Sequence, residues 1–292
     1  MAATTQETGR QENPAESILF RLRNSVFTIG FVLIALFFIG WFVFPLYILF
    51  KVSVSEPEDV LTRNPPLLIE NFTWDHWRDT FDLDRILPPL QMSLTVATGT
   101  AIMCILIAAP AAYAISRLPR KWRYTIVLAL LFTRMFPEVT IATPIAARFY
   151  GWGLSDSEIG LILAHMIRNL PFVAWILVGT FEVIPVDLEE ASQVDGAGRI
   201  STLIRIVFPL ALPGVVVAAI FAWLDSWNDL LWAIYLLPSE FTLPRLTYYY
   251  AARGGFFDVA TFSVILTIPV FLLTLFLQRY IRTGYLSGAV KG

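Results

Sequence analysis

Long apolar segments alternate with short polar connections along this chain. Six apolar segments stand out: Val26–Phe50, Leu90–Ser116, Tyr124–Ala146, Ile159–Phe181, Val207–Tyr235 and Val259–Ile281. About twenty apolar residues in a helix span a hydrocarbon core of ~30 Å. Because backbone groups in lipid must be paired within the chain, each segment is predicted to be a helix that crosses a membrane. An alternative end for the fifth segment lies near Trp223.

Composition supports the membrane assignment. The chain has 292 residues, of which 57% are hydrophobic and 15% are charged, whereas a soluble domain is about a quarter charged. A net charge of −2 gives no support for a nucleic-acid partner. The single cysteine, Cys104, excludes an intrachain disulfide.

The distribution of lysine and arginine predicts the orientation. With the N-terminus inside, the inner connections hold twelve of the 21 basic residues and the outer ones hold seven. Cytoplasmic loops carry the excess of Lys and Arg, and the turn Arg117–Arg123 is the most basic. Both termini and the connection 182–207 are therefore expected in the cytoplasm.

The polar stretches divide the chain further. The N-terminal stretch lacks the basic start and cleavage site of a signal peptide, and the aromatic residues Phe72, Trp74 and Trp77 suggest a folded cap in the longest connection. The predicted organisation is a disordered cytoplasmic tail (1–24), a first transmembrane helix (25–50), an extracytoplasmic cap (51–89), a core (90–281) that contains the loop 182–207, and a cytoplasmic C-terminal tail (282–292).

The loop 182–207 is a polar island with local helix signals. Asp187 and Glu190 have the spacing of a capping box, which predicts a helix that begins here. Leu188, Ala191 and Val194 would share one face of that helix. Glycine at 196 and 198 then predicts a break before a second helix, from about residue 199 to 209.

The same loop carries the most specific motif of the chain. Glu190-Ala191-Ser192, then Gly196, Ile206 and Pro209, resemble the EAA loop of permease subunits in ATP-binding-cassette (ABC) importers. That pattern reads E-A-A, three residues, G, nine residues, I-x-L-P. Ser192 replaces the second alanine and Phe208 the leucine. An ordinary interhelical loop is the alternative interpretation.

The resemblance implies that this loop contacts an ATPase subunit. The small side chains of Ala191 and Ser192 would let the backbone of the ATPase approach closely. The carboxylates of Glu190 and Asp195 would pair with cations of that partner. The residues assigned to this contact are Asp187, Glu190, Ala191, Ser192, Asp195, Gly196, Ile206 and Pro209.

The chain lacks a phosphate-binding loop, because none of its three lysines follows a glycine. Its two histidines, His76 and His165, lie far apart, and no Cys/His cluster suggests a metal site. We therefore expect a non-catalytic subunit without cofactors, which relies on ATP and Mg²⁺ bound by its partners.

Polar residues within the apolar segments suggest a pathway, because ionisable groups at membrane depth usually face a bundle interior or water. Arg134 and Glu138 are four residues apart and are predicted to pair on one helix face, which favours a structural role. The Trp227-Asn228-Asp229 sequence resembles the W-N-[DE] element of sugar-importer permeases, and either lines the pathway or contacts a docked binding protein. The pathway candidates are Arg134, Glu138, His165, Arg168, Asn169, Asp225, Trp227, Asn228 and Asp229.

Taken together, these features are similar to the carbohydrate branch of ABC importer permeases, the MalG-type sugar permeases. The resemblance implies an all-α membrane protein with six transmembrane helices and the type I ABC importer permease fold, in the cell membrane of a bacterium or archaeon. It implies a second homologous permease subunit, two ATP-binding-cassette ATPase subunits, an extracytoplasmic sugar-binding protein and membrane lipid as partners. The glycine-rich stretch Gly284–Gly292 resembles the tail that reaches the ATPases in this branch.

The implied cargo is a di- or oligosaccharide such as trehalose or maltose. A polyol or glycerol-phosphate is the second possibility for the cargo. A secondary transporter driven by an ion gradient and a membrane scaffold are the alternatives from other functional classes.

Overall fold

The computed structural model describes residues 14–81 and 83–289, and it describes side chains for residues 27–81 and 85–278. This part of the chain is helical apart from turns and one isolated β-bridge between Ser55 and Phe72. The chain separates into two units, residues 1–51 and 52–292.

The first unit consists of most of helix α1, Pro14–Ser53. Its stretch Phe27–Ser53 is long and apolar enough to span a membrane, and aromatic rings one turn apart stack along it, such as Phe37 on Trp41 at 6.0 Å. Residues 14–24, predicted as part of a disordered tail, are helical instead. Proline at the first helical position suits the fixed φ of that residue, and the apolar residues that follow favour helix.

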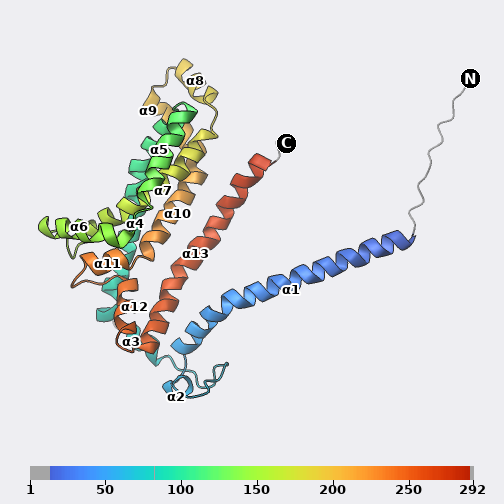
Figure 1. Cartoon of the computed structure of the whole chain (residues 1–292), viewed down its shortest axis with the longest axis vertical. Coiled ribbons are helices and arrows are strands. Elements are labelled where there is room, and N and C mark those ends of the chain that lie inside the picture. Colours follow the sequence, from blue (N-terminus) through green and yellow to red (C-terminus); the bar gives the residue numbers. More distant parts are fainter. Residues whose placement is uncertain (1–13, 82, 290–292) are drawn as a thin grey trace, which may run out of the picture. The chain divides into compact units, whose positions relative to one another are not determined.

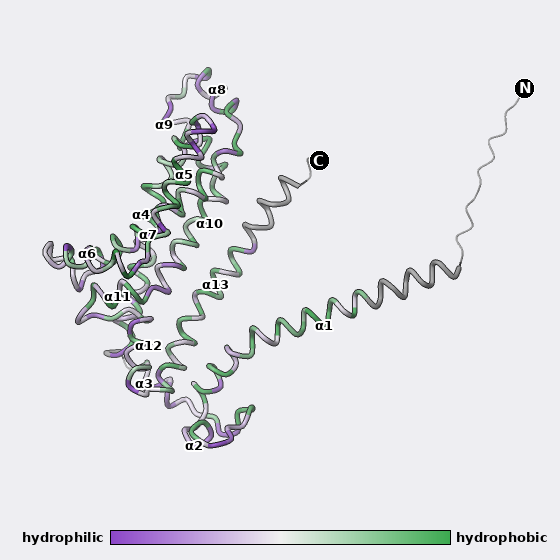
Figure 2. Tube along the Cα trace, viewed as in Figure 1, coloured by the Kyte–Doolittle hydropathy of each residue, from purple (hydrophilic) through white to green (hydrophobic). Residues whose placement is uncertain are grey.

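The described residues of the second unit form thirteen helical segments, of which α8 and α9 lie at one end and α3 and α12 at the other (Figure 1). Figure 2 shows that α10 and the coloured part of α13 are mostly hydrophobic, whereas hydrophilic and hydrophobic stretches alternate around α2. The segments of this unit are α2 (Pro57–Val60), α3 (Asp75–Thr80), α4 (Leu83–Ser116), α5 (Arg120–Thr133), α6 (Glu138–Gly151), α7 (Glu158–Glu182), α8 (Asp187–Val194), α9 (Arg199–Thr202), the π-helical turn η1 (Leu203–Val207), α10 (Phe208–Trp227), α11 (Leu231–Leu236), α12 (Leu243–Ala251) and α13 (Phe256–Ala289).

Helices α4, α7 and α10 pack against one another to form the main core. The α4 and α10 sides of this core consist largely of alanine, for example Ala108, Ala112 and Ala218, which are almost fully buried. Small side chains let helices approach closely in a membrane, where lipid supplies no hydrophobic drive for association. The α7 side supplies larger residues, such as Leu177 and Phe181.

The third apolar segment is not one continuous helix, contrary to the prediction for Tyr124–Ala146. Helix α5 ends at Thr133, and α6 begins at Glu138 after a bend of 80°. Pro137 explains the break, because proline has no backbone N–H and disfavours helical geometry in the residue before it. Residues 134 and 138 therefore do not share a helix face.

The helix formed by the fifth apolar segment is also shorter than the predicted span Val207–Tyr235. Helix α10 ends at Trp227, and Leu231 starts the separate short helix α11. The side chain of Asp229 accepts a hydrogen bond from the backbone N–H of Trp232 at 3.0 Å, which satisfies a free donor at the start of α11.

The segment 52–89 is folded against the ends of α12 and α13. The ring of His76 stacks on Phe257 at 4.3 Å. Arg85, in the first turns of α4, donates hydrogen bonds to the hydroxyl of Tyr250 at 2.8 Å and to the carboxylate of Asp258 at 2.9 Å. These contacts hold α3 and α4 to α12 and α13.

Five helices of the described chain are long and apolar enough to span a membrane, or six if the bent pair α5–α6 counts as one span. The prediction of an all-α membrane protein is thereby confirmed.

A glycine at the contact between α7 and α10 gives a test of this packing. A Cβ at Gly214 would lie 2.2 Å from Oγ1 of Thr180, whose hydroxyl is held by the carbonyl of Ile176. We expect Gly214→Ala to lower the free energy of unfolding by about 1–3 kcal/mol, because overpacking forces neighbours apart. Thermal unfolding in detergent measures the change.

Gly179→Ala is the matched control, since nothing lies within 4 Å of a Cβ at that position. Equal melting temperatures for the two variants would contradict the packing described here.

Candidate functional site

Helices α8 and α9 form a corner at one end of the second unit (Figure 1). The corner turns at Gly196, whose φ of +88° lies in the left-handed region that favours glycine. The N–H of Ala197 donates to the carbonyl of Ser192 at 3.0 Å, which closes the end of α8. A helix, a glycine corner and a second helix were all expected from the sequence.

The start of α8 differs from the expected capping box. Asp187 is the first helical residue rather than the cap, and the cap position, Val186, has helical dihedral angles and no side-chain hydrogen bond. A capping side chain needs an extended backbone at its own position. Because the chain leaves α7 in nearly helical geometry, Asp187 cannot take that role.

Helix α8 has two different faces. Leu188 and Val194 are exposed, with 43% and 87% of their surface accessible, and Glu190 and Ala191 are exposed beside them. Ser192 was expected on the contact side but is buried, and its hydroxyl lies 2.9 Å from the hydroxyl of Thr202 on α9. It therefore joins the two helices of the corner.

The remaining motif residues lie along the path from α8 to α10. Asp195 caps the end of α8 and is exposed. Ile206 is half-buried within the π-turn η1, and Pro209 follows in the first turn of α10. Proline cannot donate to the carbonyl four residues before it and its ring clashes there, so a wider π-turn directly before it accommodates the ring.

Glu189 is the residue of this loop that the sequence did not single out. It is 5% exposed, and its carboxylate accepts hydrogen bonds from the Tyr113 hydroxyl at 2.5 Å and from Nε of Arg117 at 2.8 Å. Its spacing of three from Ser192 could have placed both on the inward face of α8. Arg117 had been assigned only as a marker of orientation.

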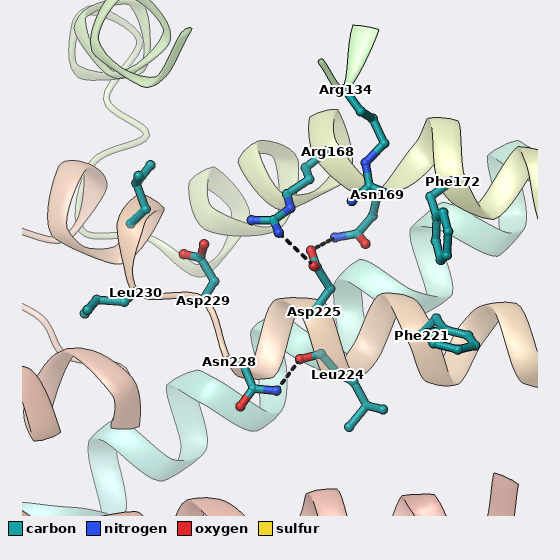
Figure 3. Close-up of a pocket in the computed structure, with 11 residues that line it drawn as sticks. Arg134, Arg168, Asn169, Phe172, Phe221, Leu224, Asp225, Asn228, Asp229 and Leu230 are labelled. Atoms are coloured by element: carbon teal, nitrogen blue, oxygen red, sulfur yellow. Dashed lines mark hydrogen bonds and ion pairs between the residues drawn. The ribbon is translucent and has the colours of Figure 1, made fainter. Parts of the chain in front are cut away.

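A second site is a cavity of about 650 Å³ between α7, the end of α10 and the α5–α6 bend. Figure 3 shows that Arg168 and Asn169 on α7 point toward Asp225 on α10. The aromatic rings of Phe172 and Phe221 lie on one side of this cavity. Arg134, Asn228 and Asp229 complete its polar lining.

Arg168 is the centre of the charge network in this cavity. Its guanidinium lies 2.6 Å from the carboxylate of Glu138 and 3.2 Å from that of Asp225. Asn169 donates a further hydrogen bond to Asp225 at 3.0 Å. One cation is thus held between carboxylates from two other helices.

The predicted pairing of Arg134 with Glu138 is wrong. The bend at Pro137 separates the two side chains, so that Glu138 pairs with Arg168 and also accepts a hydrogen bond from the indole of Trp232 at 2.7 Å. Arg134 instead lies over the ring of Phe172, 4.9 Å from its centroid.

His165 lies behind the cavity and links α7 to α10 and to the connection between α10 and α11. It is 3% exposed, its Nδ1 lies 2.6 Å from the hydroxyl of Ser226, and its Nε2 lies 3.1 Å from the carboxylate of Asp229. Trp227, in contrast, does not line the cavity. It is buried on another side of α10, where its indole donates to the carbonyl of Leu266 on α13 at 3.1 Å.

Among the described residues, no group of histidine, cysteine, aspartate and glutamate has an arrangement that could hold a metal ion.

Comparison with known proteins gives one consistent family. Residues 101–287 match the family described as binding-protein-dependent transport system inner membrane components. The trehalose transport system permease protein SugB of Mycobacterium tuberculosis is 32% identical over 87% of this chain and 94% of its own length. The trehalose/maltose transport system permease protein MalG of Thermococcus litoralis is 29% identical over 93% of this chain and 98% of its own length.

Among solved structures, a bacterial ABC transporter for the import of alginate is similar in fold. Its matching chain has a TM-score of 0.70 at 21% identity and covers 93% of this chain and 99% of that one.

The glycine corner yields a prediction for α8. Alanine at position 196 would need a left-handed backbone, which costs roughly 1–2 kcal/mol for a residue with a Cβ. We therefore expect Gly196→Ala to loosen the corner and to speed amide hydrogen exchange in α8, as measured by mass spectrometry. Gly198→Ala is the control, because Gly198 has an ordinary extended backbone with φ of −71° and open space around its Cβ. Identical exchange in both variants would refute the strain argument.

Proposed function

Because the chain belongs to the family of binding-protein-dependent transport system inner membrane components, we propose that it conducts a di- or oligosaccharide through a cytoplasmic membrane as one subunit of an ATP-driven importer. Permeases of this family are non-catalytic and carry no cofactor, and ATP is bound by partner ATPase subunits. In the proposed complex, this chain pairs with a second homologous permease, two ATPase subunits bind at the α8 end, and an extracytoplasmic sugar-binding protein delivers the cargo.

An exposed apolar surface carries the proposal. The α8–α9 face comprises Leu188 and Val194 on α8, Ile200 on α9 and Ile204 in the adjoining η1, which are 43%, 87%, 74% and 61% exposed. Apolar side chains gathered beside charged ones mark a protein interface when they do not face lipid. The basic turn Arg117–Arg123 lies at the same end, which supports a cytoplasmic location for this face.

The α8–α9 face suits a helical ATPase partner. Its apolar residues would enter a groove in the ATPase, while Glu190 and Asp195 at its rim would pair with lysine or arginine there. Ser192 would act within this chain, by fixing α9 against α8.

The cavity beside Arg168 is proposed to lie on the cargo pathway. Sugars are bound by planar hydrogen-bonding groups together with aromatic faces, and the cavity offers Asn169, Asn228, Phe172 and Phe221. The cavity lining holds two arginines, Arg134 and Arg168, and two aspartates, so it carries no excess positive charge. A phosphorylated cargo is therefore less suited to this lining than a neutral sugar.

The named relatives support the same class of cargo, since two of them transport trehalose or trehalose and maltose by their descriptions. A polyol or glycerol-phosphate is the second candidate. A secondary transporter would need an ion gradient, and a scaffold would move no solute.

The docking proposal predicts the effect of charge on the α8–α9 face. We expect the double change Leu188→Asp and Val194→Asp to reduce the amount of ATPase that purifies with the tagged permease at least about tenfold, because each aspartate would be buried without a partner in the interface. Quantitative mass spectrometry of the gently extracted complex measures this ratio. Leu68→Asp changes a leucine that is 74% exposed in the segment predicted to lie outside, and should leave the ratio unchanged. Full ATPase recovery in the double variant would refute docking at this face.

The pathway proposal predicts a defect in transport. We expect Asn228→Ala to slow import about 3–10-fold, since one hydrogen bond to the cargo contributes about 1 kcal/mol. The assay uses vesicles that hold the complete importer and ATP, with labelled trehalose, maltose and glycerol 3-phosphate tested in turn. Asn64→Ala, at an exposed asparagine outside the cavity, is the control. Import at the unmodified rate in Asn228→Ala would remove this residue from the pathway.

A further inference from the structure

Besides its chain connection to α7 through residues 183–186, helix α8 is linked to the rest of the second unit by two routes. One route runs along the chain, through the corner at Gly196, α9 and the π-turn η1 into α10. The other route runs through the side chain of Glu189 to Tyr113, in the last turn of α4, and to Arg117, directly after that helix. The two routes lead to different helices, so their relative stiffness decides which helix moves with α8.

The route through Arg117 is built from several charged hydrogen bonds. Nε and Nη2 of Arg117 both donate to Oε1 of Glu189. The same guanidinium donates to the carbonyls of Phe181 at 3.0 Å and Ile184 at 3.4 Å. These carbonyls belong to the last turn of α7 and the residues directly after it, which lack helical partners. Arg117 therefore ties α4, α7 and α8 together with one planar group.

Tyr113 fixes the second oxygen of the same carboxylate. Its hydroxyl donates to Oε2 of Glu189 at 2.5 Å, and its ring packs edge-on against Phe181 at 5.8 Å. The side chains of Glu189 and Arg117 are 7% and 20% exposed, so water screens their contact little. Glu189 is thus held at both oxygens by α4.

The route toward α10 is weaker. Between α8 and α9, the described side-chain contact is the hydrogen bond between the neutral hydroxyls of Ser192 and Thr202. Charge-assisted hydrogen bonds are roughly twice as strong as neutral ones. The chain between these helices also includes a left-handed glycine, followed by a π-turn. The glycine corner and the π-turn both bend more readily than a continuous α-helix.

We propose that Arg117 and Tyr113 are positioning residues that hold α8 as a rigid extension of the α4–α7 pair, so that a displacement of α8 moves these two helices directly. The inference rests on the proposed function, in which ATPase subunits push on α8. Helix α7 carries Arg168 and Asn169 into the cavity, so it would transmit the displacement there along one helix, which contains Pro171.

The primary test is Glu189→Gln in the complete importer, reconstituted in vesicles with its ATPases and binding protein. Glutamine keeps the size of the side chain but leaves Arg117 without its carboxylate. Because the α8–α9 face is untouched, we expect the ATPases to stay bound and to hydrolyse ATP, while the sugar imported per ATP falls about tenfold. Tyr113→Phe, which removes one hydroxyl, should produce a smaller loss in the same direction.

Glu182→Gln is the matched control. Glu182 forms an ion pair with Arg123 at 2.5 Å at the same end of the unit, between α5 and α7, and that pair does not include α8. Its change should leave the ratio of sugar to ATP unaltered. An unaltered ratio in Glu189→Gln, or loss of the ATPases from that variant, would overturn the proposal.

A distance measurement tests the rigid link without any cargo. Spin labels at Leu118→Cys and Gln193→Cys report on the turn directly after α4 and on the end of α8, and the single native cysteine, Cys104, is fully buried. We expect one narrow distance distribution that stays unchanged when ATP is added, and a broadened one when Glu189→Gln is also present. A narrow distribution in that variant would overturn the link. If the unmodified complex imports no sugar, the proposed function fails, and this distance measurement alone decides the inference.

Discussion

Hydrocarbon offers polar groups no hydrogen-bonding partner, and this constraint determines how the second unit is built. The backbone satisfies it by forming helices. The polar side chains that lie within the spans satisfy it by pairing across helices, as Arg168 does with Glu138 and Asp225. These cross-links are costly to break, because a lost partner leaves a charge unpaired. They consequently fix where α6, α7 and α10 meet and where the cavity forms.

Polar groups are also paired across helices at the α8 end, where the pairing fixes a helix rather than a cavity. There, Arg117 satisfies the free carbonyls after α7 and the carboxylate of Glu189 at the same time. A structural requirement of one helix end thereby also fixes the helix that carries the exposed α8–α9 face. In the proposed importer, α8 carries part of the face that contacts the ATPases, and Arg117 fastens α8 to α7, the helix that reaches the cargo cavity.

The sequence predicted the general architecture well, because length and apolarity determine membrane helices and glycine determines the corner at position 196. It also placed Arg168, Asn169 and Asp225 among the pathway candidates, and the structure brings them together. It failed where one residue changed the local geometry. Pro137 breaks an otherwise largely apolar segment, and because of this break Glu138 pairs with Arg168 instead of Arg134. Nor did it predict the contact between Glu189 and Arg117, since 72 residues separate them and only tertiary packing brings them together.

The most direct test of the account is sugar uptake by sealed vesicles that contain this permease, its homologous partner, the ATPases and the binding protein. The account predicts that labelled trehalose or maltose accumulates only when hydrolysable ATP is present on the ATPase side, and that a proton ionophore does not stop it. Uptake without ATP that collapses with the ionophore would contradict an ATP-driven importer and identify a secondary transporter instead.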